Sequence, residues 1–278
     1  MLNPLKARHY EGIITHDLLF SYWRIFFCSR RYSAVIKLRG MAISISSDFL
    51  RKKSPVFIII LIIAAGYVLF ISKENILMAE TKLIQLPKPL NKGNVSFEEV
   101  IFRRRSQRSF KQKDLSLQQI SQLLWAAQGI TAEKGFYSLR TAPSAGALYP
   151  MEIYLLAKNG LFRYLPNGHK LESLSEQDLR GALAVSSLEQ AAISQAPASI
   201  VICAVYSRLT SKYGQRGIRY VHIEIGHIAQ NIHLQAVALG LGSVPIGSFN
   251  DEELKKILSL PINHEPLYII PVGYSDSS

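Results

Sequence analysis

The chain has 278 residues, of which 48% are apolar, and its mean hydropathy of +0.13 excludes a disordered protein and allows one sizeable folded domain. The formal net charge is +12, but residues 1–54 hold ten basic and three acidic side chains and so carry more than half of it. Because the basic excess belongs mainly to this segment, we expect no nucleic-acid partner. Cys28 and Cys203 lie far apart without a paired motif, so neither a disulfide framework nor a zinc site is expected.

The first element expected along the chain is a transmembrane or signal-anchor helix at residues 55–72. Residues 55–71 are an uncharged apolar run that follows three basic residues, Arg51, Lys52 and Lys53. At about 1.5 Å per residue the run covers about 25 Å, close to the lower limit for a membrane span. The basic cluster predicts that the N-terminus stays in the cytoplasm and that the rest of the chain lies outside it. A buried core helix and a signal peptide cleaved near Ala79 are the alternatives.

The segments on either side of this run carry weaker signals. Residues 1–54 form a basic N-terminal segment with no clear pattern, and Met41 is an alternative start because the segment after it is typical of the beginning of a signal anchor. Residues 73–95 are predicted to be a linker, since residues 86–94 contain two prolines and a glycine but no periodicity. The compact domain is therefore expected over residues 96–278.

The elements predicted for this domain interleave helices and strands. Ser96 with Glu99, and Ser116 with Gln119, have the spacing of a capping box and predict two helix starts. The second of these helices is expected to stop at Gly129. The remaining pattern consists of a hairpin over residues 151–173, a strand over residues 198–206, a long helix over residues 219–242 and a strand over residues 266–274. We therefore expect an α+β fold with a mixed or antiparallel sheet.

The first candidate site is the basic segment FRRRSQRSFKQK, residues 102–113. Part of it has a structural explanation, because the three arginines at 103–105 close a helix where cations suit the helix dipole. Three more cations follow without an acid before Asp114, and Ser106 adds a hydroxyl among the guanidinium groups. This combination is typical of a site for a phosphate or polyanion, and a solvated basic turn is the alternative interpretation.

Two glycine-containing loops are the second and third candidates. In RTAPSAGALYP, residues 140–150, small residues between two prolines allow backbone amides to approach a flat ligand, although a tight loop would also use Gly146. In ALGLGSVPIGSFND, residues 238–251, the glycines follow a helix, whereas a Rossmann dinucleotide loop requires strand, glycines and helix in that order. We therefore expect a chain reversal that leaves the backbone amides of Gly247 and Ser248 unobstructed.

Three further patterns favour structural roles. His222, Glu224, His227 and His233 crowd one predicted helix, but a di-iron site needs a second ExxH motif and two more carboxylates, so no metal is expected. A serine hydrolase is not supported, because the sequence contains no GxSxG motif. Cys203 stands in the apolar run ASIVICAVY and is expected to be a small buried residue.

Five motifs, taken in order, resemble a known family. They are RRSQRSF, PSAGALYP, KYGQRGIRY, EIGHIAQNIHLQAVALGLGS and IIPVGY, and together they cover about residues 97–274. This pattern is similar to the FMN-dependent nitroreductase superfamily, and more closely to its SagB/ThcOx branch of azoline dehydrogenases. The resemblance implies a nitroreductase-like α+β sheet flanked by helices, in a homodimer with two FMN molecules at the subunit interface. The predicted long helix resembles the central dimer helix of the family, which gives His222, His227 and Gln230 an interface or core role.

The resemblance also implies roles for the three candidate segments. The phosphate and ribityl chain of FMN, and the polar edge of the flavin, would be reached by Arg104, Arg105, Ser106 and Arg108. The loop lying against the flavin from the partner subunit would be Pro143, Ser144, Ala145 and Gly146. The other flavin face would meet Pro245, Ile246, Gly247 and Ser248. The backbone N–H of Gly247 would face flavin N5 and stabilise the charge that develops there during hydride transfer.

Lys212 and Tyr213 resemble the Lys-Tyr pair of the azoline dehydrogenases. In that family a base removes a ring proton as hydride leaves for the flavin, and the tyrosine relays or orients the proton. Without the resemblance, both residues would be interpreted as surface loop residues.

Two features depart from the family pattern. The chain ends at SDSS soon after the final strand, so the phosphate would rely on residues 104–108 without further basic residues. The azoline dehydrogenases are cytoplasmic and lack an anchor, so the expected membrane helix argues against a peptide-modifying role.

The function predicted from the sequence is an FMN-dependent oxidoreductase that transfers hydride in a ping-pong cycle, with a small-molecule or peptide substrate. With the domain outside the cytoplasm, the electron donor would be a membrane quinol or the organic substrate itself. An NAD(P)H-dependent nitro or quinone reductase facing the cytoplasm is one alternative. A flavin-binding module without turnover is the other.

Overall fold

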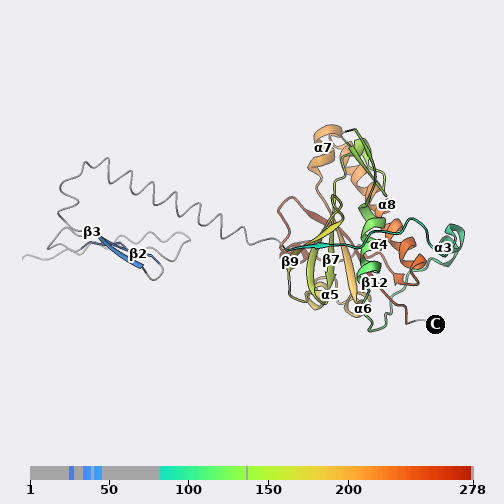
Figure 1. Cartoon of the computed structure of the whole chain (residues 1–278), viewed down its shortest axis with the longest axis horizontal. Coiled ribbons are helices and arrows are strands. Elements are labelled where there is room, and N and C mark those ends of the chain that lie inside the picture. Colours follow the sequence, from blue (N-terminus) through green and yellow to red (C-terminus); the bar gives the residue numbers. More distant parts are fainter. Residues whose placement is uncertain (1–24, 28–33, 39–40, 46–81, 136, 277–278) are drawn as a thin grey trace, which may run out of the picture. The chain divides into compact units, whose positions relative to one another are not determined.

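The computed structural model describes residues 25–27, 34–38, 41–45, 82–135 and 137–276. The chain divides into two compact units, Met1–Ala79 and Glu80–Ser278. In the first unit, β1 (Ile25–Phe27), β2 (Ala34–Leu38) and β3 (Met41–Ile45) pair antiparallel in that order. In the second unit, helices pack around a central sheet (Figure 1).

The second unit is built on a seven-stranded sheet whose neighbouring strands pair antiparallel. In order across the sheet, the strands are β11 (Gly242–Ser243), β12 (Glu265–Gly273), β10 (Ala198–Ala204), β7 (Met151–Ala157), β8 (Gly160–Leu165), β9 (Lys170–Ser175) and β4 (Leu83–Gln85). A separate hairpin joins β5 (Ile130–Lys134) to β6 (Tyr137–Arg140). The predicted α+β fold is therefore confirmed.

Helices cover both faces of this sheet. One core cluster joins the sheet to two helices, α4 (Leu117–Gln128) and α8 (Arg216–Ala238), which also pack against each other. The cluster on the opposite face joins it to α5 (Arg180–Ser186), α6 (Ala191–Gln195) and α9 (Asp251–Ile257). The remaining helices of the unit are α3 (Phe97–Arg103), α7 (Ser207–Tyr213) and the 3₁₀ turn η1 (Ala145–Ala147).

The central position of β10 explains its continuous apolar sequence. Alternate residues of a strand point to opposite faces, so Ile200 and Ile202 pack on the α4–α8 side while Val201 and Cys203 pack on the other. Every residue of β10 is buried. The prediction that Cys203 is a small buried residue is confirmed.

Both predicted helix starts are present, but only one of them has both hydrogen bonds of a capping box. At α4 the Ser116 hydroxyl accepts from the Gln119 amide, and the Gln119 side chain accepts from the Ser116 amide, so the capping box is complete. At α3 the Ser96 hydroxyl accepts from the Glu99 amide, but the Glu99 carboxylate pairs with Arg103 one turn later. An i,i+4 ion pair has therefore taken the place of the second capping contact.

The segment predicted as a linker is attached to the domain wherever the structure describes it, from residue 82 onward. β4 pairs with β9 at the edge of the sheet, and Leu86 is buried beside it. Beyond β4, the buried α4 side chains Ser121 and Gln122 hold the backbone. Ser121 donates to the Pro87 carbonyl over 2.6 Å, and Gln122 bonds both backbone groups of Leu90. This contact with α4 keeps residues 86–91, called the strap below, on the domain.

The predicted membrane anchor, and with it the predicted position of the domain outside the cytoplasm, is corrected by the structure. Within the described ranges, no helix has both the length and the apolar character that a bilayer span requires. α8 has 23 residues, but Glu224, His227 and Gln230 interrupt its apolar positions. Residues 55–72, on which the prediction rested, lie outside the described residues.

Candidate active site

The basic segment leaves the end of α3 and runs beside the β11–β12 edge of the sheet. Ser106 forms a parallel bridge with Ser243, and the Gln107 amide donates to the Ser243 carbonyl over 3.0 Å. Gly242 permits this approach, because a Cβ there would stand 2.7 Å from the Gln107 Cβ. Further along, the Lys111 amide donates to the Tyr274 carbonyl over 2.9 Å. Backbone hydrogen bonds therefore hold the segment along this edge.

Arg104 is tied to this edge through a buried histidine of α8. Its guanidinium donates to His233 Nε2 over 3.0 Å, and His233 Nδ1 lies 2.6 Å from the Ser243 hydroxyl. Because a guanidinium can only donate, Nε2 is the acceptor and Nδ1 carries the hydrogen. Burial first, and then the charge of Arg104, lower the pKa of His233 to about 4, so the ring is neutral at physiological pH.

The cations of this segment are open to solvent to different degrees. Arg104 is half-buried, whereas Arg105, Ser106 and Arg108 are exposed. Arg105 donates to two carbonyls at the end of α3, those of Phe102 and Arg104. The segment thus presents positive charge at the surface, beside a backbone held in place by β11.

The third candidate segment lies along the same edge. The amide of Ile246 donates to the Ile269 carbonyl of β12 over 2.8 Å, and the Ile269 amide donates back over 2.9 Å. Ile246 is buried, Pro245 is half-buried, and Gly247 and Ser248 are exposed, as the predicted chain reversal requires. The structure therefore brings the first and third candidate segments together at the β11–β12 edge.

The second candidate segment forms a tight turn at another place. Gly146, Ala147 and Tyr149 have φ angles of +64°, +54° and +46°, a left-handed conformation that side chains disfavour. A Cβ on Gly146 would stand 2.7 Å from the Tyr213 hydroxyl and 3.1 Å from Lys212 Nζ. The turn and the α7 pair that resembles the Lys-Tyr motif are therefore direct neighbours.

A buried polar cluster underlies this turn, and the sequence interpretation missed it. Glu224 of α8 is 2% exposed, and burial raises its pKa to about 7 against opposing hydrogen bonds from Ser144 and Gln128. Arg140 of β6 donates to Gln128 over 3.0 Å and lies over the Tyr149 ring. The feature of the sequence that could have indicated this cluster is Glu224 itself, a single acidic residue on the inward face of a predicted helix.

The histidines near Glu224 are divided among different faces of α8. His222 bonds the Tyr206 hydroxyl over 2.8 Å, His227 is exposed, and His233 points toward Ser243. Among the residues described, no group of three His, Cys, Asp or Glu side chains is placed to hold a metal ion.

The two groups of candidate residues lie at separate levels of α8. Tyr220 contacts Tyr213, with ring centroids 5.2 Å apart, and His233 contacts Ser243. Thirteen residues separate these two positions, which corresponds to about 20 Å along a helix. Within one chain, the turn at residues 143–146 is thus not brought to the basic segment.

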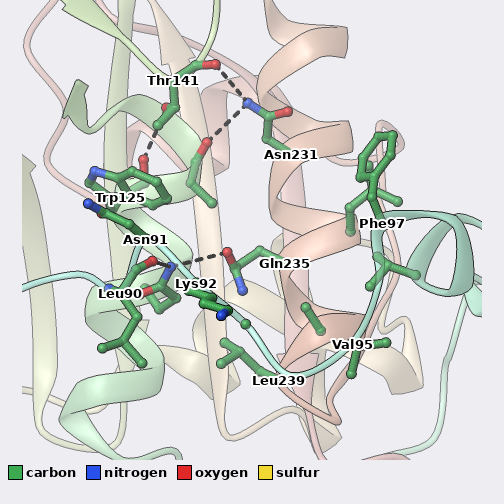
Figure 2. Close-up of a pocket in the computed structure, with 16 residues that line it drawn as sticks. Leu90, Asn91, Lys92, Val95, Phe97, Trp125, Thr141, Asn231, Gln235 and Leu239 are labelled. Carbon is green, nitrogen blue, oxygen red and sulfur yellow. Dashed lines mark hydrogen bonds between the residues drawn. The ribbon is translucent and has the colours of Figure 1, made fainter. Parts of the chain in front are cut away.

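A cavity of about 410 Å³ lies between the strap, α4 and α8 (Figure 2). Its walls include Leu90, Trp125 and Leu239, and Asn231 donates from one side to the carbonyls of Ala126 and Thr141. None of the candidate site residues lines it. The cavity is therefore separate from both groups.

Comparison with known proteins identifies the class that this fold and site define. A sequence profile of the nitroreductase family matches residues 101–274, more than half of the chain. The chain belongs to the nitroreductase family and is an oxidoreductase enzyme.

Individual relatives narrow the class. A protein of Methanocaldococcus jannaschii, named as a candidate nitroreductase, is 41% identical over 202 residues, which are 70% of this chain and 98% of that protein. The microcin B17-processing protein McbC of Escherichia coli is 29% identical over 134 residues, 44% of this chain and 48% of McbC. A crystal structure of a candidate nitroreductase from Ralstonia eutropha JMP134 has a TM-score of 0.63 at 30% identity, covering 72% of this chain and 92% of that chain. The similarity to McbC confirms the resemblance to the SagB/McbC-type branch.

Proposed function

We propose that the protein is an FMN-dependent oxidoreductase that transfers two electrons as hydride in a ping-pong cycle. The observation that carries the proposal is that two segments follow the same β11–β12 edge, where Ser106 pairs with Ser243 and Ile246 pairs with Ile269. Exposed cations stand on the first of these segments, and the exposed backbone of Gly247 and Ser248 belongs to the second. A phosphate group requires the former, and close approach of a flat ring requires the latter.

The residues at this edge fit FMN by their chemistry. Arg104, Arg105 and Arg108 can donate paired hydrogen bonds to phosphate oxygens, and Ser106 adds a hydroxyl. Gly247 offers a backbone N–H without a side chain, where it would stabilise charge that develops on the ring during the reaction. When bound, FMN supplies the two-electron chemistry that no side chain provides.

The turn at residues 143–146 would complete the site from a partner subunit. The turn approaches α8 at Glu224, which lies nine residues and so about 14 Å along the helix from His233, where the basic segment is tied. A symmetric dimer is the simplest way to bring the two together. α8 exposes Ile223, His227 and Gln230, and α3 exposes Phe102. The exposed apolar side chains of Ile223 and Phe102 on these two helices support a homodimer.

Lys212 and Tyr213 would act on the substrate beside this turn. In its neutral form, Lys212 Nζ would accept a proton from the substrate as hydride leaves the neighbouring atom, and Tyr213 Oη would orient that proton. Their common position against Gly146 supports this assignment, because the turn and the end of α7 would then reach the interface together.

The substrate defines two versions of the proposal. The similarity to McbC supports a SagB-type dehydrogenase that oxidises an azoline ring in a peptide. The similarity to the two candidate nitroreductases supports an NAD(P)H-dependent reductase of nitro compounds or quinones. A flavin-binding module without turnover would need neither activity.

The visible spectrum of the purified full-length chain is the first test. We expect the spectrum of an oxidised flavin, and acid release should yield FMN in about a one-to-one ratio to chain. A colourless protein that takes up no added FMN would overturn the cofactor, the site residues and the mechanism together.

Turnover assays then separate the versions. Bleaching of the flavin by NAD(P)H and reoxidation by a nitroaromatic or quinone would identify the reductase, and dehydrogenation of an azoline peptide would identify the SagB-type enzyme. Lys212→Ala should retain the flavin and lose azoline oxidation at least about 100-fold, the usual contribution of a positioned base. Lys158→Ala, an exposed lysine in the β7–β8 turn, is the matched control and should keep full activity. Unchanged azoline oxidation in Lys212→Ala would remove that residue from the mechanism.

A further inference from the structure

The turn at residues 144–149 is strained and must be held by its surroundings. Ala147 and Tyr149 adopt left-handed φ angles although neither is a glycine. Such residues persist only where neighbouring contacts determine them, and they often occur at functional sites. What holds this turn therefore determines where Gly146 stands.

The contacts that hold the turn come from several elements. The Tyr149 amide donates to the Ser144 hydroxyl over 2.9 Å and closes the turn. The Tyr149 hydroxyl accepts from the Arg140 amide over 3.2 Å, and the Tyr149 carbonyl accepts from Arg208 of α7 over 2.9 Å. Ser144 also faces inward, because its hydroxyl is close enough to the Glu224 carboxyl group to lower the pKa of that acid.

Glu224 is buried beneath the turn with spare hydrogen-bonding capacity. Since the Ser144 oxygen accepts from Tyr149, its own proton is available to donate to the Glu224 carboxyl group. The Glu224 Oε1 atom also accepts from Gln128 over 3.4 Å, while Oε2 is buried with no hydrogen-bond partner among the described residues. A buried acid that is only partly satisfied is costly, which suggests a role other than packing.

We propose that Glu224 is a positioning residue, which holds the turn at residues 144–149 through Ser144 and thereby sets Gly146 against Tyr213 and Lys212. This inference rests on the proposed function, since it assigns Glu224 to the same site. Glu224 does not touch the substrate, because it lies below the turn and is buried.

The charge of Glu224 determines how firmly it holds Ser144. A hydroxyl donates more strongly to a carboxylate than to a neutral carboxylic acid. Burial raises the pKa of Glu224 to about 7, so the stronger bond forms as the pH rises through neutrality. The charged group that faces Glu224 is Arg140 of β6, and that guanidinium is flanked by Tyr149, Glu152 of β7 and Arg208 of α7.

Glu224→Gln in the full-length chain tests the proposal, because glutamine keeps the shape and the acceptor oxygen but cannot ionise. Below about pH 6 the wild-type acid is itself neutral, so variant and wild type should have equal kcat. Above about pH 8 the variant should fall about tenfold below wild type, the difference expected for one charge-assisted hydrogen bond. Flavin content should stay unchanged, because the basic segment contacts α8 at His233.

Two companion measurements separate this inference from the proposed function. Hydrogen exchange of the Tyr149 amide needs no flavin, and above about pH 8 it should be about tenfold faster in Glu224→Gln than in wild type at the same pH. In Ser144→Ala, the further change Glu224→Gln should cost no additional kcat, since the bond between them is already lost. Glu172→Gln, in the ion pair with Arg163 on β8, is the control and should change neither quantity.

The inference fails if exchange of the Tyr149 amide is the same in wild type and Glu224→Gln at high pH. It also fails if the loss of kcat is independent of pH or is accompanied by loss of flavin, as a purely structural role predicts. A protein that binds no flavin but shows the predicted exchange would refute the proposed function and leave the link between Glu224 and the turn standing.

Discussion

His233 and Glu224 are two buried ionisable residues of α8 whose pKa values are shifted in opposite directions by folding. The pKa of His233 is lowered, and that of Glu224 is raised. His233 is buried neutral between Arg104 and Ser243, whereas Glu224 is buried beneath the turn at residues 144–149. For both, burial is the largest cause of the shift. Each therefore contributes its own pH dependence to the free energy of unfolding.

His233 should make the protein sensitive to acid. Its folded pKa of about 4 lies below the ordinary 6.5, so its stabilising contribution is complete above pH 6.5 and is lost as the pH falls toward 4. At about 1.4 kcal/mol per pKa unit, the loss amounts to about 3 kcal/mol. Urea unfolding at several pH values should show this slope in wild type and a flatter one in His233→Gln. His222→Gln, on the exposed side of α8, should keep the wild-type slope.

Glu224 should have the opposite effect at higher pH. Its folded pKa of about 7 lies above the ordinary 4.5, so its stabilising contribution is complete below pH 4.5 and is lost as the pH rises through 7. The loss is again about 3 kcal/mol. Between pH 5 and 8, Glu224→Gln should therefore become more stable relative to wild type in the same unfolding measurements. Parallel curves for the two proteins would contradict the shift.

At the scale of single elements, the turn before β7 depends on Gly146 for two reasons. Its φ of +64° disfavours a side chain, and an added Cβ would meet the Tyr213 hydroxyl. Gly146→Ala should lose about 1–2 kcal/mol of stability for the backbone strain, and should also lose turnover because Tyr213 must move. Gly135→Ala is the matched control, since φ is +60° there and nothing lies within 4 Å. Equal turnover in the two variants would show that the contact with Tyr213 is unimportant.

The strap over α4 depends on buried hydrogen bonds of the helix. Ser121 donates to the Pro87 carbonyl and lies 2.7 Å from His169 Nε2. Ser121→Ala should lower the free energy of unfolding by about 1–3 kcal/mol, because it leaves buried acceptors unsatisfied. It should also speed proteolysis within residues 86–91. Ser211→Ala, on exposed α7, should change stability by less than about 0.5 kcal/mol.

At the scale of the whole molecule, the proposed dimer makes each site a joint product of two chains. An Arg104→Ala subunit would lack part of the phosphate segment, and a Lys212→Ala subunit would lack the proposed base. A mixed dimer contains one Arg104→Ala subunit and one Lys212→Ala subunit. Both substitutions then fall in the same site, and the other site has neither of them. Mixing the two inactive variants should therefore restore up to about a quarter of wild-type turnover, since half of the dimers are mixed and each has one intact site. If the mixed variants are shown to exchange subunits and still have no activity, each site must lie within a single chain.

The fold could be predicted from the sequence where a local rule decides the outcome. The capping box at Ser116, the apolar run of β10 and the end of α4 at Gly129 follow from short-range chemistry. Gly129 was expected to end the helix as a C-cap glycine, but the structure requires a glycine there for a different reason. Its φ of −62° is ordinary, but a Cβ there would overlap the Trp125 ring. The contacts of the strap could not be predicted within the linker expected at residues 73–95, because its partners, Ser121 and Gln122, lie about thirty residues away in α4.

The sequence by itself determined the α+β class, the family resemblance and the three candidate segments, because these depend on residue types at fixed spacings along the chain. The tertiary structure decided which segments meet. It placed Ser106 against Ser243 and Ile246 against Ile269 along one edge of the sheet, and it placed Gly146 against Lys212 and Tyr213. It also showed that Glu224, grouped in the sequence with three histidines of one predicted helix, is buried beside Ser144 of that turn and Gln128 of α4. Contacts between distant segments depend on how helices and strands pack, and no local pattern encodes that packing.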